Sequence, residues 1–454
     1  DKCRNMFALG IIFYLTNKTL DHTFAYLERK FAKKPAVIEL NKAVLTEGYE
    51  YADKLELIHS KIVEVAQADM PKGRYRNITG NVATAWGLLA AAERAGLKLF
   101  LGSYPITPAT DVMIELAKHK ALGAKVFQAE DEIAGICSAI GASYAGAMAC
   151  TSTSGPGLSL KSEALGLAVM TELPLVVVDV QRGGPSTGLP TKTEQSDLNQ
   201  ALFGRNGEAP CIVVAASSSA NCFYWAYNAA KLALEHMTPV ILLTDGYLGN
   251  GTQLFRIPKV ADLPAINPPI AKANDPDYMP YRRNPETLVR QWAIPGTEGL
   301  RHRIGGLEKE DGKGSVSTDP ENHRKMVYNR QEKVNRVANY IPEQEVMGNP
   351  DADLLVIGWG GTAGALTLAV EEMNNEGKKV ALAHFRYINP LPANTADVLR
   401  RYKKIVVAEQ NMGQFAGYLR TRISGIELQQ YNEVKGQPFV VADLVKEFTK
   451  MMEE

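Results

Sequence analysis

The 454-residue chain has only five cysteines, none of them in a CxxC pair, and its seven histidines show no metal-ligand spacing. This composition argues against a disulfide framework, a zinc or other metal site, and an iron–sulfur cluster held by this chain alone. Cys137, Cys150 and Cys211 lie in apolar runs. We expect them to be small core residues in a reducing, cytoplasmic compartment.

The chain also lacks an excess of charge of either sign, because 50 Lys and Arg balance 50 Asp and Glu. Without a basic field or an arginine–aromatic patch, nothing indicates nucleic-acid binding. No apolar stretch is long enough to span a membrane. The start of the chain imitates a signal peptide, but no clean cleavage site follows and helical sequence continues to about residue 31. We interpret it as a core helix at a truncated end.

What the chain does contain is 45% hydrophobic and 22% charged residues, as globular proteins do, and a length that suggests two or three domains. Residues 1–76 read as helices with one short strand at 36–40. Residues 77–247 alternate apolar strands with helices, which indicates a parallel sheet covered on both faces. Its strands are expected at 97–101, 125–128, 148–153, 175–180, 211–215 and 240–244.

The remaining sequence divides into two further segments. Residues 248–347 are rich in proline, glycine and charge and contain one amphipathic helix, at 322–340, so they predict an extended connector. Residues 348–454 form a second, smaller alternating unit. Its strands are expected at 354–358, 380–384, 404–409 and 439–441.

Unusual loops follow four strands of the first unit. They are SYPITPAT, the AEDEIAG run, TSTSGPG and QRGGPSTG. Open parallel sheets bind ligands beyond the carboxyl ends of their strands. We therefore expect these four loops to converge on one site.

Glu132 begins a helix of small residues after the second of these strands. Thiamine diphosphate chemistry needs a buried carboxylate that promotes the imino tautomer of the aminopyrimidine and so forms the thiazolium ylid. Glu130 is a competing acid, and the structural alternative is a surface acid favoured by the helix dipole. The small residues that would allow close approach to a neighbour or a flat ring are Ala134, Gly135, Ser138, Ala139, Gly141 and Ala142.

Thr107 lies in a turn, Tyr104-Pro105-Ile106-Thr107-Pro108, whose two prolines present its hydroxyl rigidly. The same turn could merely begin a helix. Ser154 and Gly155 in the next loop could touch a pyrimidine ring or simply make the turn.

Arg182 follows a strand of five apolar residues and one acid and precedes Gly-Gly-Pro. A guanidinium in this position can clamp a carboxylate through two hydrogen bonds, although a salt bridge to Glu194 or Asp197 is the alternative. The polar loop 185–193, which includes Thr187 and Lys192, suits a second carboxylate or a diphosphate.

Two further motifs are incomplete. The turn GWGGTA at 358–363 fits a dinucleotide-binding pattern, but the next strand ends His384-Phe385-Arg386 instead of in an acid, so a close-packed turn is the better interpretation. Thr244-Asp245-Gly246 matches half of the GDG metal motif of thiamine enzymes, without its asparagine pair. The chain thus has a glutamate for the pyrimidine end of the cofactor but no complete motif for binding magnesium and the diphosphate. We therefore expect that a partner is required.

Together, YPITP, AEDEIA, TSTSGPGL, DVQRGGPSTGLPTKTEQSDL and AEQNMGQFAGYLR resemble the α subunits of 2-oxoacid:ferredoxin oxidoreductases, above all the 2-oxoglutarate type. The resemblance covers nearly the whole chain from about residue 77. It implies an α/β fold of the thiamine-diphosphate-binding type, with 77–247 as the pyrimidine-binding domain and 348–454 as a transketolase C-terminal-like domain. Residues 1–76 resemble the tail of a truncated γ-type domain.

The resemblance implies oxidative decarboxylation of 2-oxoglutarate with coenzyme A to succinyl-CoA, with electrons passing to ferredoxin, and the reverse carboxylation of a reductive tricarboxylic acid cycle. A β subunit would hold Mg²⁺, the diphosphate and a [4Fe–4S] cluster in an α2β2 heterotetramer. The alternatives are a member acting on pyruvate or branched-chain 2-oxoacids, a nucleotide-dependent dehydrogenase and a noncatalytic scaffold. The polar loop 185–193 favours 2-oxoglutarate.

The resemblance also implies roles for individual residues. Glu132 would activate the cofactor, and Thr107 and Arg182 would engage the 2-oxoacid carboxylate near the reacting carbon. Further cofactor contacts would come from Tyr104, Pro105, Ile106, Ser154 and Gly155. Further substrate contacts would come from Thr187 and Lys192.

Overall fold

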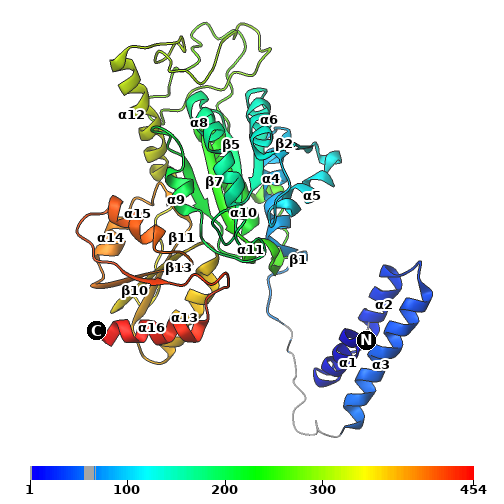
Figure 1. The fold of residues 1–454 in the computed structure, drawn as a ribbon. Helices are drawn as coiled ribbons and strands as arrows, with labels where there is room; N and C mark the ends of the chain where they lie inside the picture. The colour runs from blue at the N-terminus through cyan, green and yellow to red at the C-terminus, as the bar shows by residue number, and fades with distance from the viewer. Residues whose placement is uncertain (1–2, 56–65, 67, 454) are drawn as a thin grey trace. The chain divides into compact units, whose positions relative to one another are not determined.

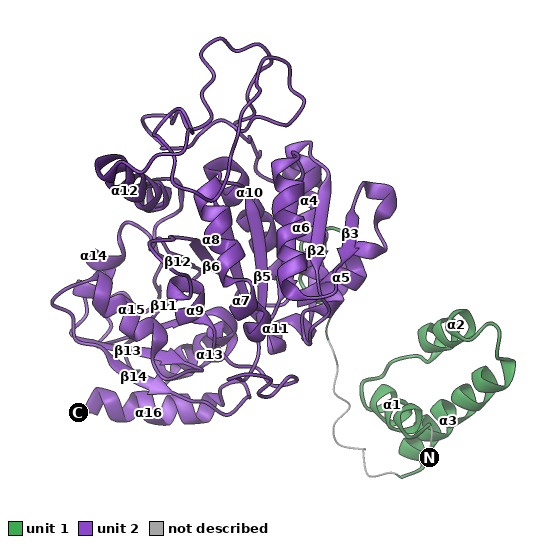
Figure 2. Cartoon of the chain, turned by 45° about the horizontal axis from the view of Figure 1, so that its top comes forward, with its two compact units in different colours: residues 1–73 green, residues 74–454 purple. Residues whose placement is uncertain are grey.

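The computed structural model describes residues 3–55, 66 and 68–453, which divide into two units, 1–73 and 74–454 (Figures 1 and 2). The described residues of the smaller unit form three helices. They are α1 (Arg4–Leu15), α2 (Asp21–Lys30) and α3 (Pro35–Lys54). The helix expected at the start of the chain is present as α1, which lies so close to α3 that a side chain at Gly10 would collide with the Leu45 carbonyl; Gly10 is the one buried residue of α1.

The strand predicted at 36–40 is also wrong, because these residues lie inside α3. Pro35 stands in the first turn of that helix, where its missing N–H has no helical partner to lose. Ile38, Leu45 and Ala52 recur every seven residues and are buried on one face. This helical periodicity over twenty residues outweighs the local β-branched pair Val37-Ile38 that suggested a strand.

The larger unit is built around a seven-stranded sheet in the order β12-β6-β7-β5-β4-β2-β3. All neighbours are parallel except β12, which runs antiparallel to β6. The strands are β2 (Leu99–Ser103), β3 (Lys125–Gln128), β4 (Met148–Thr153), β5 (Leu175–Gln181), β6 (Ile212–Ala215), β7 (Pro239–Asp245) and β12 (Tyr387–Asn389). The predicted parallel sheet is confirmed.

Helices cover both faces of this sheet, as its apolar strands predict. On one face the core contains residues of α4 (Gly80–Ala95), α5 (Thr110–Ala117) and α10 (Cys222–His236). The helices that contribute to the core on the other face are α6 (Glu132–Tyr144), α7 (Gly155–Leu160), α8 (Ser162–Thr171) and α9 (Leu198–Phe203). Ile136, Ala139 and Ile140 of α6 point into that core, and Cys137 falls on the exposed face of the helix. The prediction of a buried Cys137 is therefore wrong, whereas Cys150 and Cys211 are buried.

A second sheet has the order β14-β13-β10-β11-β9, parallel except for β9. Its strands are β9 (Met347–Gly348), β10 (Leu354–Trp359), β11 (Val380–Phe385), β13 (Lys404–Glu409) and β14 (Gln429–Asn432), and its helices are α13 (Ala363–Asn375), α14 (Thr395–Arg400), α15 (Gln414–Arg422) and α16 (Val441–Glu453). Leu355, Ile357 and Val407 join the core of the α6–α9 face, so the two sheets share one core.

The strand predicted at 439–441 is wrong. Residues 439 and 440 are irregular and residue 441 begins α16. The apolar residue that suggested a strand, Phe439, packs with Leu444 and Phe448 in the core of the second sheet. The fifth strand, β14, consists of polar residues at 429–432, which gave no strand signal.

A two-stranded antiparallel ribbon, β1 (Tyr75–Thr79) with β8 (Thr252–Arg256), lies before the long irregular segment. Other short elements of the larger unit are α11 (Gly246–Asn250) and the 3₁₀ turns at Lys120–Leu122, Val260–Asp262 and Gly360–Thr362. The amphipathic helix expected at 322–340 is α12 (Pro320–Arg336), continued by a 3₁₀ turn, Val337–Tyr340.

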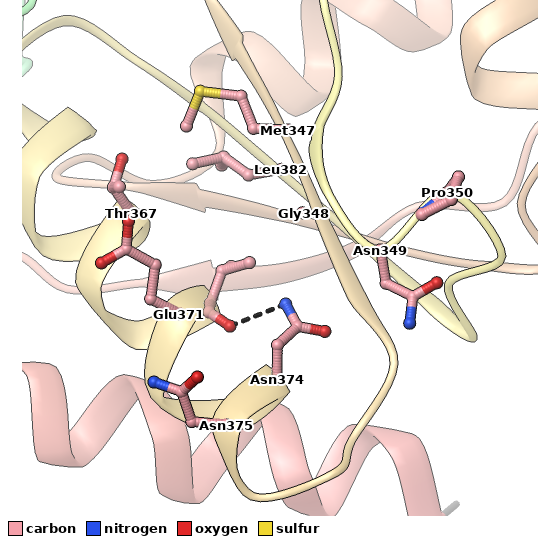
Figure 3. A pocket seen from close by; sticks show the side chains of 10 residues that line it. Met347, Gly348, Asn349, Pro350, Thr367, Glu371, Asn374, Asn375 and Leu382 are labelled. Carbon is pink, nitrogen blue, oxygen red and sulfur yellow. Dashed lines mark hydrogen bonds between the residues drawn. The ribbon is translucent and has the colours of Figure 1, made fainter.

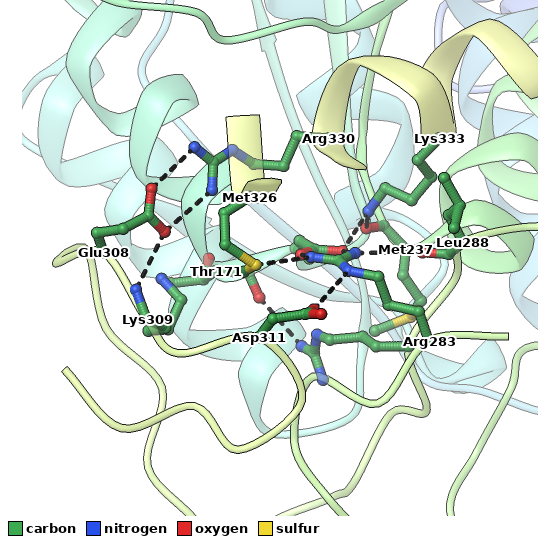
Figure 4. Close-up of polar contacts among 12 residues, drawn as sticks. Thr171, Met237, Arg283, Leu288, Glu308, Lys309, Asp311, Met326, Arg330 and Lys333 are labelled. Atoms are coloured by element: carbon green, nitrogen blue, oxygen red, sulfur yellow. Dashed lines mark hydrogen bonds and ion pairs between the residues drawn. The ribbon is translucent and has the colours of Figure 1, made fainter. Parts of the chain in front are cut away.

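Buried charges attach the irregular segment and α12 to the end of α8 (Figure 4). Glu172, at the end of α8 and 1% exposed, forms ion pairs with Arg283 and with Lys333, whose Nζ is 2.6 Å away. Burial works against the Glu172 carboxylate, but the two cations hold its pKa below the ordinary range. Arg283 lies in the irregular segment and Lys333 on α12, so one acid ties both to α8.

Replacing Glu172 with glutamine is expected to destabilise the protein by about 3–5 kcal/mol, since it leaves two buried cations without their acid. Urea unfolding of both forms measures the effect. The matched control is Glu321→Gln, which removes an exposed ion pair with Arg324 and should change stability by less than about 0.5 kcal/mol. Equal unfolding midpoints for the Glu172 variant and the wild type would contradict a fastening role.

Candidate active site

The carboxyl ends of β5, β4, β2 and β3 lie side by side, because these strands are adjacent and parallel. The four loops singled out in the sequence leave the sheet at these ends. Their expected convergence at one edge is therefore confirmed.

Glu132 is the first residue of α6, after the N-cap Asp131, whose side chain accepts from the backbone N–H of Ala134 at 2.7 Å. Its side chain is 8% exposed, and within the described residues no hydrogen bond or ion pair engages its carboxylate. A Cβ on Gly157 would lie 2.8 Å from Glu132 Cγ, so the glycine leaves the room that this acid occupies. Glu130, by contrast, is exposed. The surface-acid alternative thus describes Glu130 and not Glu132.

The small residues of α6 allow it to lie against β2. A side chain at Gly102 of β2 would collide with Ser138 Oγ and the Gly135 carbonyl. This close approach fixes the start of the helix, and with it Glu132, next to the loop that follows β2.

Arg182 and Thr107 meet across two loops. Arg182 is 6% exposed, and its Nη1 donates to the backbone carbonyl of Thr107 at 2.7 Å. Its Nε has no partner within the described residues. The side chains of Thr107 and Tyr104 are exposed, and Pro105 and Ile106 are half-buried. The structure therefore leaves both the guanidinium and the threonine hydroxyl with capacity for a ligand.

A cavity of about 620 Å³ borders this arginine. Its lining comes from the segments that follow β4 and β5 in the first sheet and from the segments that follow β13 and β14 in the second. The lining residues are Gly155, Pro156, Ser159, Leu160, Arg182, Gly183, Gly184, Pro185, Ser186, Glu194, Ser196, Asp197, Gln200, Asn411, Met412, Gln414 and Val434. Both sheets thus contribute to one pocket.

The predicted residues do not all line this cavity. Gly155 does, while Ser154 is fully buried and its hydroxyl has no partner among the described residues. Thr187 and Lys192 lie on the exposed part of their loop and are not among the lining residues. Backbone bonds at Gly183, including one from its N–H to the Lys192 carbonyl at 3.0 Å, close that loop on itself.

Gln195 joins the end of the loop to the second sheet. Its side chain donates to the Trp359 carbonyl at 2.8 Å and accepts from the backbone N–H of Gln410 at 2.9 Å. Asn411 donates to the Gln195 carbonyl at 2.9 Å. These bonds fix the position of the wall that carries Arg182, and sequence reasoning gave no sign of them.

Sequence reasoning also missed a buried cluster of acids. Asp179 lies on the same face of β5 as Val177. Its carboxylate oxygens have no hydrogen-bond partner within the described residues. Asp197 lies against Gly155. Burial raises the pKa of Asp179, and the neighbouring Asp197 raises it further. Burial likewise raises the pKa of Asp197 and of Glu194. Arg182 opposes the rise in the pKa of Asp197, so the arginine and this acid interact electrostatically. The one acid within the apolar run of β5 was the available signal.

The motif at Thr244-Asp245-Gly246 has a structural role. Asp245 Oδ1 accepts from Thr193 Oγ1 and from the N–H groups of Tyr247 and Leu248, each at 2.9 Å, and so caps α11. A side chain at Gly361 would collide with this carboxylate, so the GWGGTA turn is close-packed at this glycine.

A separate hollow of about 560 Å³ lies beside β9 (Figure 3). Asn374 on its wall donates to the Val370 carbonyl at 2.8 Å. The lining of this hollow contains none of the predicted site residues.

The described residues contain no group of three or more His, Cys, Asp or Glu placed to bind a metal. None of the helices in the described part of the chain combines the length and hydropathy that a bilayer crossing requires.

Two family models match the chain. The model of the thiamine-diphosphate-binding domain of pyruvate flavodoxin/ferredoxin oxidoreductases matches residues 90–320, and that of pyruvate:ferredoxin oxidoreductase core domain II matches residues 352–441. Together these segments contain every strand of the seven-stranded sheet and every strand of the second sheet except β9.

Relatives are similar over most of the chain. The 2-oxoglutarate oxidoreductase subunit KorA of Mycobacterium tuberculosis is 51% identical, over 98% of this chain and 67% of its own length. The 2-oxoglutarate synthase subunit KorA of Methanothermobacter marburgensis is 32% identical, over 79% and 94%. A solved structure, the 2-oxoglutarate:ferredoxin oxidoreductase from Magnetococcus marinus with 2-oxoglutarate, coenzyme A and succinyl-CoA bound, superposes with a TM-score of 0.91 at 36% identity, covering 99% of this chain and 77% of that one.

Proposed function

We propose the function of this chain from one premise: the chain belongs to the 2-oxoacid:ferredoxin oxidoreductases, as an α subunit close to those of 2-oxoglutarate synthases. With a partner subunit it catalyses the thiamine-dependent oxidative decarboxylation of 2-oxoglutarate with coenzyme A to succinyl-CoA and CO2, passes the electrons to ferredoxin, and in reverse carboxylates succinyl-CoA. The observation that carries this proposal is the buried carboxylate of Glu132, to which none of the described residues donates a hydrogen bond, on the same sheet edge as the Arg182–Thr107 pair.

The residues at this edge fit the pyrimidine half of thiamine diphosphate. When bound, the cofactor supplies a nucleophilic carbon that adds to the 2-oxo group and accepts the electrons of decarboxylation. Glu132 holds a proton at the pyrimidine ring nitrogen, for which its carboxylate is free and Gly157 leaves room. Tyr104, Pro105, Ile106, Ser154 and Gly155 form the surrounding wall.

Arg182 and Thr107 bind the 2-oxoacid carboxylate. The planar guanidinium, held by its bond to the Thr107 carbonyl, retains N–H donors for two parallel hydrogen bonds to a carboxylate. Thr187 and Lys192, on the polar loop, bind the distal carboxylate of 2-oxoglutarate. Both residues are exposed, so a substrate can contact their side chains.

The partner is a β subunit that holds Mg²⁺, the cofactor diphosphate and a [4Fe–4S] cluster, in an α2β2 assembly that reduces ferredoxin. Asp245, in the half-motif that would otherwise suggest a metal ligand, already uses its carboxylate to cap α11. The domains are a γ-type tail at 1–76, a pyrimidine-binding domain at 77–247, a connector at 248–347 and a transketolase C-terminal-like domain at 348–454. Three buried cysteines without disulfides suit a cytoplasmic enzyme.

Substrate preference in the reconstituted complex, measured with a dye acceptor, tests this proposal. We expect kcat/KM for 2-oxoglutarate to exceed that for pyruvate and for 2-oxoisovalerate by about tenfold or more, since polar groups placed for a second carboxylate lose their partner with an alkyl chain. Lys192→Met should lower kcat/KM for 2-oxoglutarate and leave that for pyruvate unchanged. A preference for pyruvate would contradict the substrate assignment.

A further inference from the structure

Lys161 is a fully buried lysine beside the proposed active site. Its side chain is 0% exposed, and it stands where α7 ends and α8 begins. Its backbone N–H donates to the Gly157 carbonyl at 3.0 Å, and its own carbonyl accepts from the N–H of Leu165 at 2.9 Å. The backbone of the residue is therefore fixed on both sides, and its side chain extends from there to α6.

The ammonium of Lys161 donates to the backbone carbonyl of Glu132 at 2.8 Å. This is its one side-chain hydrogen bond within the described residues. The bond holds the first residue of α6 from the side of α7 and α8, while Asp131 caps the same turn from within the helix. Glu132 is thus positioned by two independent contacts.

A cation in this position is energetically unfavourable for the fold alone. A positive charge next to a helix N-terminus opposes the helix dipole, and burial of an ammonium costs hydration. Burial lowers the pKa of Lys161 to about 8, against which the nearby Glu132 and Asp131 carboxylates act. The other titratable groups around it are Cys137 on α6 and, beyond that cysteine, Glu163 on α8. An apolar side chain of the same length would fill the space without this cost.

We infer that Lys161 is a positioning residue, which holds the start of α6 so that the Glu132 carboxylate meets the pyrimidine ring of the cofactor. The inference rests on the proposed role of Glu132. The lysine itself touches neither substrate nor cofactor. It acts through the carbonyl of Glu132.

The test compares Lys161→Met with the wild type in the reconstituted complex, and Lys309→Met serves as the matched control. Lys309 is also buried, burial also lowers its pKa to about 8, and it also donates to backbone carbonyls, those of Gly305 and Leu307, but away from the site. We expect Lys161→Met to weaken thiamine diphosphate binding about tenfold by calorimetry and to lower kcat about 10- to 100-fold, with an unchanged or raised unfolding midpoint. Lys309→Met should leave cofactor affinity and kcat unchanged.

Two further variants complete the experiment. Lys161→Gln, which keeps a neutral donor on a shorter chain, should show the same losses, and it decides the matter if the methionine variant does not assemble. In a Glu132→Gln background, Lys161→Met should cause no further loss of affinity, because residues that act through one group are not additive.

The inference is overturned if a folded Lys161 variant keeps wild-type cofactor affinity and kcat, or if its losses match those of Lys309→Met and follow stability alone. Its failure is distinct from that of the proposed function. A near-normal Glu132→Gln enzyme would reject the role of the acid, whereas an inactive Glu132→Gln enzyme with a normal Lys161→Met enzyme would reject only the lysine.

Discussion

Replacing Glu132 with glutamine is expected to lower the turnover of the reconstituted enzyme by about 10²- to 10⁴-fold while leaving assembly intact. The amide has nearly the shape of the acid but cannot exchange a proton with a pyrimidine nitrogen at neutral pH. Because no described residue hydrogen-bonds the carboxylate, the substitution breaks no hydrogen bond among them, although it removes a favourable charge near Lys161. Steady-state turnover with a dye acceptor, together with sedimentation of the complex, measures both effects.

The matched control for this prediction is Glu130→Gln. Glu130 lies two residues earlier in the same loop and is exposed, so its loss should change turnover by less than about twofold. If Glu132→Gln kept near-normal turnover while Glu130→Gln did not, the two roles would have to be exchanged. If neither variant lost activity, the cofactor would be activated from elsewhere.

Arg182→Ala is expected to lower kcat/KM for the 2-oxoacid by about 10²- to 10³-fold. Truncation of one partner of a buried charged hydrogen bond costs about 2–5 kcal/mol, and each 1.4 kcal/mol corresponds to about a factor of ten. The variant also loses the bond to the Thr107 carbonyl, so the loop that carries the threonine hydroxyl loses its anchor. Initial rates over a range of 2-oxoacid concentrations separate the effects on KM and kcat.

Arg182→Lys is the informative second variant. Lysine keeps the charge but lacks the planar fork, so it should recover only part of kcat/KM. Full recovery would mean that a point charge suffices, and that the two parallel hydrogen bonds assigned to the guanidinium are not made. An Arg182→Ala enzyme within twofold of the wild type would remove this residue from the substrate site.

The parallel sheets could be predicted from the sequence because buried parallel strands are apolar along their whole length. The predicted bounds of β3, β4 and β13 agree with the structure. The convergence of the loops that follow β2, β3, β4 and β5 results from the topology of the sheet alone. Short apolar stretches outside this pattern were misread. Residues 36–40 are helical, and Phe439 packs under α16 without any strand.

The part of the site that the sequence did not predict depends on contacts between distant segments. Nothing local indicates that Lys161 is buried against the Glu132 carbonyl, or that Asp179 lies close to Asp197. The burial of a charge is decided by what packs over it, and the covering helices come from elsewhere in the chain. The roles of Thr187 and Lys192 remain predictions, because both residues lie on an exposed loop.

The central claim is that Glu132 of this chain activates a thiamine diphosphate whose charged end a second subunit holds. The most direct test is the rate at which the C2 proton of the bound cofactor exchanges with deuterium in the assembled complex, measured by quenched-flow NMR for the wild type and for Glu132→Gln. We expect the variant to bind the cofactor and to exchange this proton at least about 10²-fold more slowly. Equal exchange rates in the two complexes would contradict the claim.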